Sequence, residues 1–195
     1  IIPEDEIENY PNATALGDIF TQKTTSGYNE DTNTITYTVT VFSKAGSGGT
    51  ISIEDILTNL DTSGLTLGEN VSVSVNKAQH SASIYQQWDG SLAIADSGVI
   101  GTPTYVTPDY TVDTSTGELL MTLPALDEST QDGVMNAYDI TYTYTLADNS
   151  AGEGLSINLN NKLTATSTLK NNTDITSSSS ANVNIGSKSL ISKWA

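Results

Sequence analysis

Residues 34–42 read Thr-Ile-Thr-Tyr-Thr-Val-Thr-Val-Phe and carry the clearest structural signal in the chain. From Ile35 to Val41 every second residue is apolar, and the residues between them are threonines. Alternation with a period of two is typical of a β-strand that buries one face, and β-branched and aromatic residues favour strands. The stretch therefore predicts a strand whose apolar face packs on a hydrophobic core.

The same alternation recurs along the chain in runs of similar length. Turn-forming residues separate the runs, at 45–49, 61–64 and 148–154. About seven short strands separated in this way predict an all-β fold, an Ig-like antiparallel β-sandwich. Residues 53–60 and 127–135 could each hold a single turn of helix. The further predicted strands are residues 50–57, 71–75, 119–123, 138–146, 155–166 and 181–185.

The charge balance narrows the choice of partners. The chain has 195 residues, with 23 acidic and 7 basic side chains, and its formal net charge is −16. Such a field repels phosphate backbones and anionic lipid headgroups, so we expect no binding of nucleic acid. The absence of cysteine excludes disulfides and thiolate metal sites. No apolar run approaches the ~18 residues of a membrane helix, so no membrane insertion is expected in this segment.

The end of the chain echoes its beginning. Residues 182–193 read NVNIGSKSLISK and residues 12–23 read NATALGDIFTQK, each with Asn first and Lys last. We interpret this as a repeat junction, although the identities are few and chance is the alternative explanation. Residues 19–187 are then one complete domain, residues 1–18 the tail of a preceding repeat or a linker, and residues 188–195 the start of the following repeat. Lys193 would be the first-strand lysine of that repeat.

Three polar residues lie in phase with apolar faces: Lys23, Asp55 and Asn161. Each has an ordinary explanation by itself: a snorkelling lysine, an aspartate in a turn, and an asparagine bonded to a bulged backbone. Burying all three would be costly unless they are paired. The sequence therefore predicts that the three side chains meet in the core.

A meeting of these groups would allow a covalent crosslink. A neutral Lys23 amine is a nucleophile, and the Asn161 carboxamide beside it is an acceptor. A protonated Asp55 could polarise the amide oxygen and shuttle protons as ammonia leaves. The product is a Lys–Asn isopeptide bond within one chain, and held proximity makes a cofactor unnecessary.

Several segments carry a family resemblance, with Lys23 ahead of them: residues 35–41 (ITYTVTV), 51–57 (ISIEDIL), 138–144 (YDITYTY) and 161–166 (NKLTAT). They resemble the CnaA-type, Ig-like domains of Gram-positive collagen adhesins and pilins, and are similar to the DUF11-type repeats of bacterial surface proteins. The resemblance implies a sandwich in which a first-strand lysine bonds an asparagine near the penultimate strand, assisted by an aspartate. Here these residues are Lys23, Asn161 and Asp55.

The chain departs from this pattern at the asparagine position and in the long segment 76–117. Asn158 and Asn160 crowd the asparagine position, and either is an alternative partner for the lysine. Glu54 is an alternative acid, although its parity points outward. The segment 76–117 has no clear period and is predicted to be an elaborated loop or a hairpin insertion.

The first functional hypothesis is a structural stalk or repeat domain of a Gram-positive cell-surface adhesin or pilus-like protein. The domain would be extracellular, anchored to the cell wall through another part of the protein, monomeric, and in contact with adjacent repeats of the same chain. It would not be an enzyme beyond one self-crosslinking event. The alternative is a ligand-binding adhesin module that recognises a glycan or a host protein through four aromatic residues of segment 76–117: Tyr85, Trp88, Tyr105 and Tyr110.

Other candidate sites are weak. The acidic stretches 29–33 and 127–132 could hold Ca²⁺ through oxygen ligands, but neither has the spacing of a known loop motif, and solvated turns explain them better. We predict no metal site. His80 and Trp88 lack the neighbouring groups in the sequence that catalysis would need.

Overall fold

A computed structural model describes residues 19–43, 49–147, 156–168 and 174–186. The predicted repeat junctions, residues 1–18 and 188–195 with Lys193, lie outside the described residues, as does residue 187. The domain limits therefore stay predictions. Within the described part of the chain, no helix is long and apolar enough to cross a membrane.

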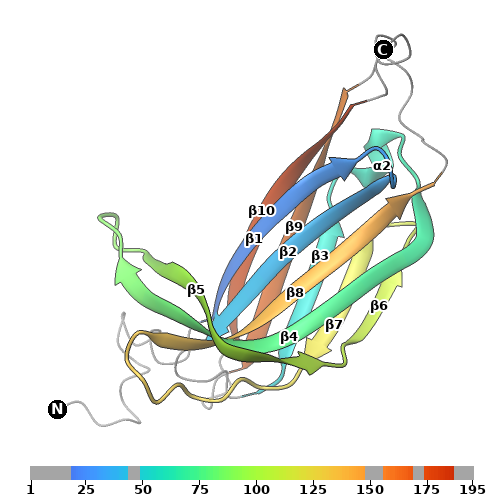
Figure 1. The fold of residues 1–195 in the computed structure, drawn as a ribbon. Coiled ribbons are helices and arrows are strands. Elements are labelled where there is room, and N and C mark those ends of the chain that lie inside the picture. Colours follow the sequence, from blue (N-terminus) through green and yellow to red (C-terminus); the bar gives the residue numbers. More distant parts are fainter. Residues whose placement is uncertain (1–18, 44–48, 148–155, 169–173, 187–195) are drawn as a thin grey trace.

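The described chain forms two antiparallel five-stranded sheets packed face to face as a β-sandwich (Figure 1). In spatial order the first sheet contains β1 (Ile19–Asn29), β2 (Thr34–Ser43), β8 (Val134–Leu146), β4 (Leu67–Gln86) and β5 (Leu92–Val106). The second contains β10 (Asp174–Gly186), β9 (Ser156–Thr168), β3 (Ile51–Leu57), β7 (Glu118–Leu123) and β6 (Asp109–Asp113). The Ig-like sandwich expected from the sequence is confirmed.

Period-two alternation positions the core. On β2 the side chains of Ile35, Tyr37, Val39 and Val41 are all fully buried between the sheets. The ladder pairs Tyr37 with Tyr142 of β8, and opposite residues of a ladder point to the same face of the sheet. The in-phase residues of β3, β7 and β9 cover the second sheet in the same way.

Strand prediction succeeded where one face is buried and fell short elsewhere. The run predicted at 71–75 is part of β4, which continues to Gln86, and β1, β5 and β6 were not among the strands predicted from alternation. The helical turns are also placed differently. The short helix α2 (Leu60–Ser63) begins where the first was expected to end, and residues 127–133 are irregular before β8 begins.

The predicted insertion 76–117 contains a hairpin formed by β4 and β5, whereas residues 109–113 form β6, an edge strand of the second sheet. The second half of β4 pairs with β5, and beyond Ser81, where β4 no longer pairs with β8, this hairpin extends from the sandwich as an arm (Figure 1). Where the arm leaves the sheet, a second apolar cluster covers the outer face of the first sheet. It contains Phe42, Ala82, Met135 and Ala137, with Phe20, Ile84 and Ile94 packed against them.

Candidate functional site

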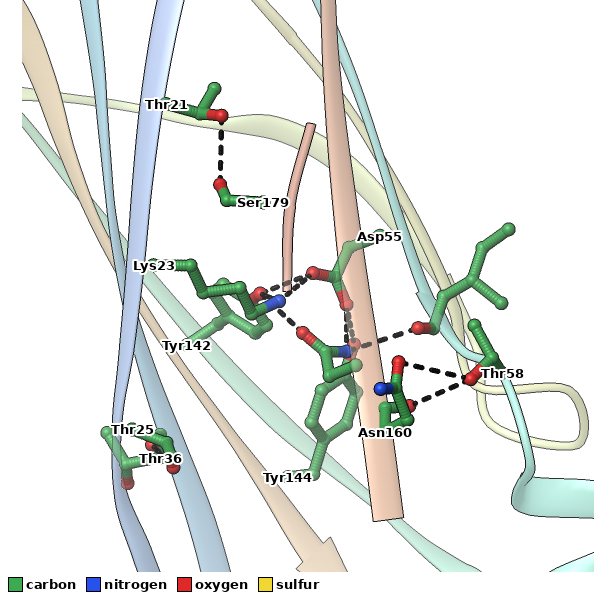
Figure 2. A network of polar contacts seen from close by, with 12 residues as sticks. Thr21, Lys23, Thr25, Thr36, Asp55, Thr58, Tyr142, Tyr144, Asn160 and Ser179 are labelled. Carbon is green, nitrogen blue, oxygen red and sulfur yellow. Dashed lines mark hydrogen bonds and ion pairs between the residues drawn. The ribbon is translucent and has the colours of Figure 1, made fainter. Parts of the chain in front are cut away.

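The structure brings Lys23, Asp55 and Asn161 together between the two sheets. Lys23 lies on β1 of the first sheet, whereas Asp55 on β3 and Asn161 on β9 belong to the second. Figure 2 shows the side chains of Lys23 and Asp55 pointing toward each other. Lys23 Nζ donates to Asp55 Oδ2 at 2.6 Å, and Asn161 Nδ2 donates to Asp55 Oδ1 at 2.5 Å. The Asp55 carboxylate therefore bridges the amine and the amide.

Strand register explains why these polar groups point inward. Lys23 lies opposite Val39, and Asp55 lies opposite Leu163, so each takes a position on the apolar face of its sheet. The exposed fraction is 0% for the side chains of Lys23 and Asp55 and 0% for Asn161. The buried cluster predicted from the sequence is thus present, with all three groups paired.

Three buried tyrosines surround the cluster: Tyr37, Tyr142 and Tyr144. The Tyr142 hydroxyl accepts from Lys23 Nζ at 2.5 Å, and it lies within hydrogen-bond reach of both Asp55 Oδ2 and Asn161 Oδ1, the latter at 3.1 Å. Asp55 thus contacts the amide nitrogen of Asn161, whereas we had expected it to contact the amide oxygen. The oxygen faces Tyr142 instead.

Sequence reasoning treated these tyrosines only as core residues. A usable signal was present, because four tyrosines (Tyr37, Tyr138, Tyr142 and Tyr144) share the inward phase of neighbouring strands, and a buried phenol hydroxyl usually needs a hydrogen-bond partner. Tyr138 donates to the backbone oxygen of Pro124, whereas the hydroxyls of Tyr142 and Tyr144 bond members of the cluster.

Burial dominates the electrostatics of the cluster. Desolvation lowers the pKa of Lys23 to about 8, and the Asp55 charge and hydrogen bond oppose this only in part. Burial also raises the pKa of Tyr142 and of Tyr144, and the nearby Asp55 adds to both shifts. Near neutral pH the site therefore holds an amine that loses its proton easily and phenols that keep theirs.

The alternative residues face elsewhere. Asn158 is exposed, and Asn160 Nδ2 donates to Asn182 Oδ1 at 2.6 Å on the outer side of β9. Glu54 is exposed on β3, as its parity predicted. Of the residues considered for the crosslink, those that meet in the core are Lys23, Asp55 and Asn161.

His80 forms a second buried ionic cluster, on the outer face of the first sheet. Its Nδ1 lies 3.0 Å from Asp96 Oδ1, and its Nε2 lies 3.0 Å from Asp139 Oδ2. Hydrogen bonds to Asp139 and Asp96 raise the pKa of His80 above its ordinary value, against the effect of burial. Phe42 packs edge-on against the ring, and Thr40 Oγ1 donates to Asp139. Since both ring nitrogens are occupied, the imidazole is not free to act as a base.

The acidic stretch 29–33 forms a turn, whereas most of the stretch 127–132 is irregular. Asn29 Oδ1 accepts from the backbone N–H groups of Asp31 and Thr32, and Asn33 takes a left-handed conformation with φ of 57°. Among the described residues, no three His, Cys, Asp or Glu side chains are arranged to hold a metal ion.

The aromatic residues of segment 76–117 are exposed but do not form one surface. Trp88 at the tip of the arm is 100% exposed, and Tyr85, three residues earlier on β4, is also exposed. Tyr105 pairs with Asn76, nine residues before Tyr85 on β4, which places it about 30 Å from the tip. Recognition of a glycan or a host protein through this segment stays a prediction, and the four residues cannot act as one platform.

No known protein family matches the chain, and no curated protein matches it. Similar solved structures include the collagen-binding subdomain of the Enterococcus faecalis surface protein ACE, the C-terminal domain of the Streptococcus pyogenes antigen I/II-family protein AspA, and the Bacillus cereus major pilin subunit BcpA. Their identities to the chain are 13%, 10% and 12%, with TM-scores of 0.43, 0.45 and 0.43. The alignments cover 85%, 86% and 86% of this chain and 97%, 46% and 40% of those structures. The chain thus spans less than half of the second and third, and the likeness concerns the fold alone.

Proposed function

We propose that this sandwich is a structural domain of a cell-surface adhesin or pilus-like protein, stabilised by a self-formed isopeptide bond between Lys23 Nζ and Asn161 Cγ. The observation that carries the proposal is the fully buried chain of hydrogen bonds from Lys23 through Asp55 to Asn161. As separate groups, a buried lysine and a buried aspartate cost more in desolvation than an apolar pair of similar size. A reaction that consumes the lysine amine would explain why these two costly groups are buried.

The positions of the groups suit amide exchange. Asp55 Oδ2 contacts the nitrogen that would attack, and Asp55 Oδ1 contacts the nitrogen that would leave. Once Lys23 is neutral, its Nζ attacks Asn161 Cγ and passes one proton to Asp55. Asp55 returns a proton to Nδ2, the Cγ–Nδ2 bond breaks, and ammonia leaves. One Nζ proton stays on the new amide, so the reaction needs no cofactor and takes place once per chain.

The bond would join the two layers of the sandwich. It would connect β1 to β9 and close a loop of 138 residues, from 23 to 161. A crosslink over a loop of this length contributes roughly 5 kcal/mol by the loop-entropy argument, provided that it is unstrained. The domain has no cysteine, so this bond would take the place that disulfides hold in other extracellular domains.

Intact mass measurement tests the proposal. The purified chain is expected to weigh one ammonia less than its sequence, and a proteolytic fragment should contain the peptides of Lys23 and Asn161 joined together. The joined fragment matters because an asparagine that cyclises to a succinimide also loses ammonia. Asn161→Ala should restore the full mass, whereas the neighbouring change Asn160→Ala should keep the deficit. A wild-type chain of full mass would refute the bond.

A further inference from the structure

Tyr142 contacts every member of the cluster. Its hydroxyl accepts from Lys23 Nζ at 2.5 Å and lies within donating reach of Asp55 Oδ2 and of Asn161 Oδ1, the latter at 3.1 Å. The other two tyrosines make fewer contacts. Tyr144 reaches only Asp55 Oδ1, at 3.4 Å, and the Tyr37 hydroxyl has no hydrogen-bond partner among the described residues.

The Tyr142 hydroxyl has one proton and two acceptors for it. Before reaction the stronger acceptor is the carboxylate of Asp55, because hydrogen bonds to charged groups exceed those to a neutral amide oxygen. When the attack on Asn161 begins, Asp55 takes up a proton from Nζ and loses its negative charge. At the same moment negative charge develops on Asn161 Oδ1, so the better acceptor becomes the amide oxygen.

We infer that Tyr142 is a catalytic residue of crosslink formation, whose hydroxyl donates to Asn161 Oδ1 and stabilises the oxyanion of the tetrahedral intermediate. The inference rests on the isopeptide bond proposed above. A contact that strengthens only as the transition state forms lowers the barrier without stabilising the unreacted chain.

The protons and electrons balance with Tyr142 in this role. The lone pair of neutral Lys23 forms the Nζ–Cγ bond, and the carbonyl electron pair moves to Oδ1, which receives a hydrogen bond from Tyr142 and no proton. The pair returns as Cγ–Nδ2 breaks, and Asp55 supplies the proton with which ammonia leaves. Tyr142 ends the reaction as it began. Burial keeps it a donor throughout, since the pKa of its hydroxyl is raised.

The test is the rate of ammonia loss in chains synthesised by cell-free translation. Synthesis is stopped at a fixed time, and the intact mass of the folded chain is followed at intervals. Tyr142→Phe removes the hydroxyl and keeps the ring, and we expect it to slow crosslinking by about 100-fold, as for the loss of one oxyanion donor. Tyr37→Phe is the matched control, because its ring is equally buried and its hydroxyl has no hydrogen-bond partner among the described residues, and it should crosslink within a few-fold of the wild-type rate.

The outcomes separate this inference from the proposed function. A wild-type chain that never loses ammonia defeats the proposed function itself. A wild-type chain that crosslinks alongside an equally fast Tyr142→Phe variant defeats only the role of Tyr142, as does equal slowing by Tyr142→Phe and Tyr37→Phe. If Tyr142→Phe does not fold, a ring-fluorinated tyrosine at position 142 keeps the shape and makes the hydroxyl a stronger donor. It should speed the reaction, and an unchanged rate would overturn the inference.

Discussion

The Lys23 cluster in the core and the His80 cluster on the outer face of the first sheet both pair a cation with carboxylate, yet the pKa values of the two cations shift in opposite directions. Lys23 shares one carboxylate with other donors and is fully buried, so desolvation outweighs attraction. His80 has one carboxylate for each ring nitrogen, and the Asp96 and Asp139 side chains remain 20% and 24% exposed. Attraction therefore exceeds desolvation at His80.

The difference shows what decides whether a buried cation reacts or only holds strands together. A lysine that loses its proton easily can become a nucleophile. An imidazole whose two ring nitrogens each bond an aspartate cannot, because neither nitrogen offers a free lone pair and the aspartates favour its protonated form. His80 instead links β4 to β5 and β8, and so fixes the base of the arm to the sheet.

The largest expected effect follows from changing the acid of the core cluster. Asp55→Ala should leave Lys23 and Asn161 unlinked while the fold persists, because the carboxylate transfers protons in the proposed reaction. The mass should rise by one ammonia relative to the crosslinked chain after the side-chain change is allowed for, and the free energy of unfolding should fall by roughly 5 kcal/mol. Glu54→Ala, on the same strand but exposed, is the control. If Asp55→Ala still crosslinks and Glu54→Ala does not, the acid is misassigned.

A smaller effect is expected when pH changes the protonation of Lys23. The pKa of about 8 means that the fraction of neutral amine grows as pH rises toward that value and levels off above it. The rate of ammonia loss after cell-free synthesis should therefore fall about tenfold for each pH unit below 8. A rate that is independent of pH over this range would show that the amine is not the group whose protonation limits the reaction.

The smallest effect concerns His80. Raising the pH should lower the stability that His80 contributes, whereas it should speed the crosslinking of Lys23. Because the folded-state pKa is raised above 6.5, the His80 cluster contributes its full stability below pH 6.5 and loses it as pH rises through the folded-state value. Each unit of difference corresponds to about 1.4 kcal/mol. His80 is the single histidine of the chain, so NMR of the imidazole protons reads its titration directly. A pKa at or below 6.5, or a His80→Gln variant with an unchanged pH dependence of unfolding, would contradict the assignment.

The sequence was sufficient for the sandwich and the core cluster because both depend on the period of a strand. Alternation in β2, β3, β7, β8 and β9 identified the inward face, on which Asp55 and Asn161 stood out as polar, and Lys23 stood out because it shares the parity of Ile19. A strand that buries one face alternates apolar and polar residues, so its inward face can be predicted without knowing which strands are its neighbours.

What could not be predicted depends on which strands become neighbours. His80 finds its partners 16 and 59 residues away, on strands that only the topology places beside β4. β5 was missed because it is an edge strand, exposed along most of its length, with irregular pairing to β4 near His80 and no alternating pattern. Tyr142 looked like an ordinary core residue, since its function depends on groups from both sheets.

The position of β10 determines how the proposed domain would respond to mechanical load. Tension applied between Ile19 and Gly186 would pass through β1, the bond and the end of β9, and strands β2 to β8 would carry none of it. β10 lies outside the closed loop, antiparallel to β9, with its last residue, Gly186, opposite Ser156, so its hydrogen bonds would break one pair at a time from that end. The 13 residues of β10 could then release up to about 45 Å of chain, while residues 162–167 of β9 stay paired with β3. Under tension the domain would extend mainly through the reversible detachment of β10, and its other strands would stay in place.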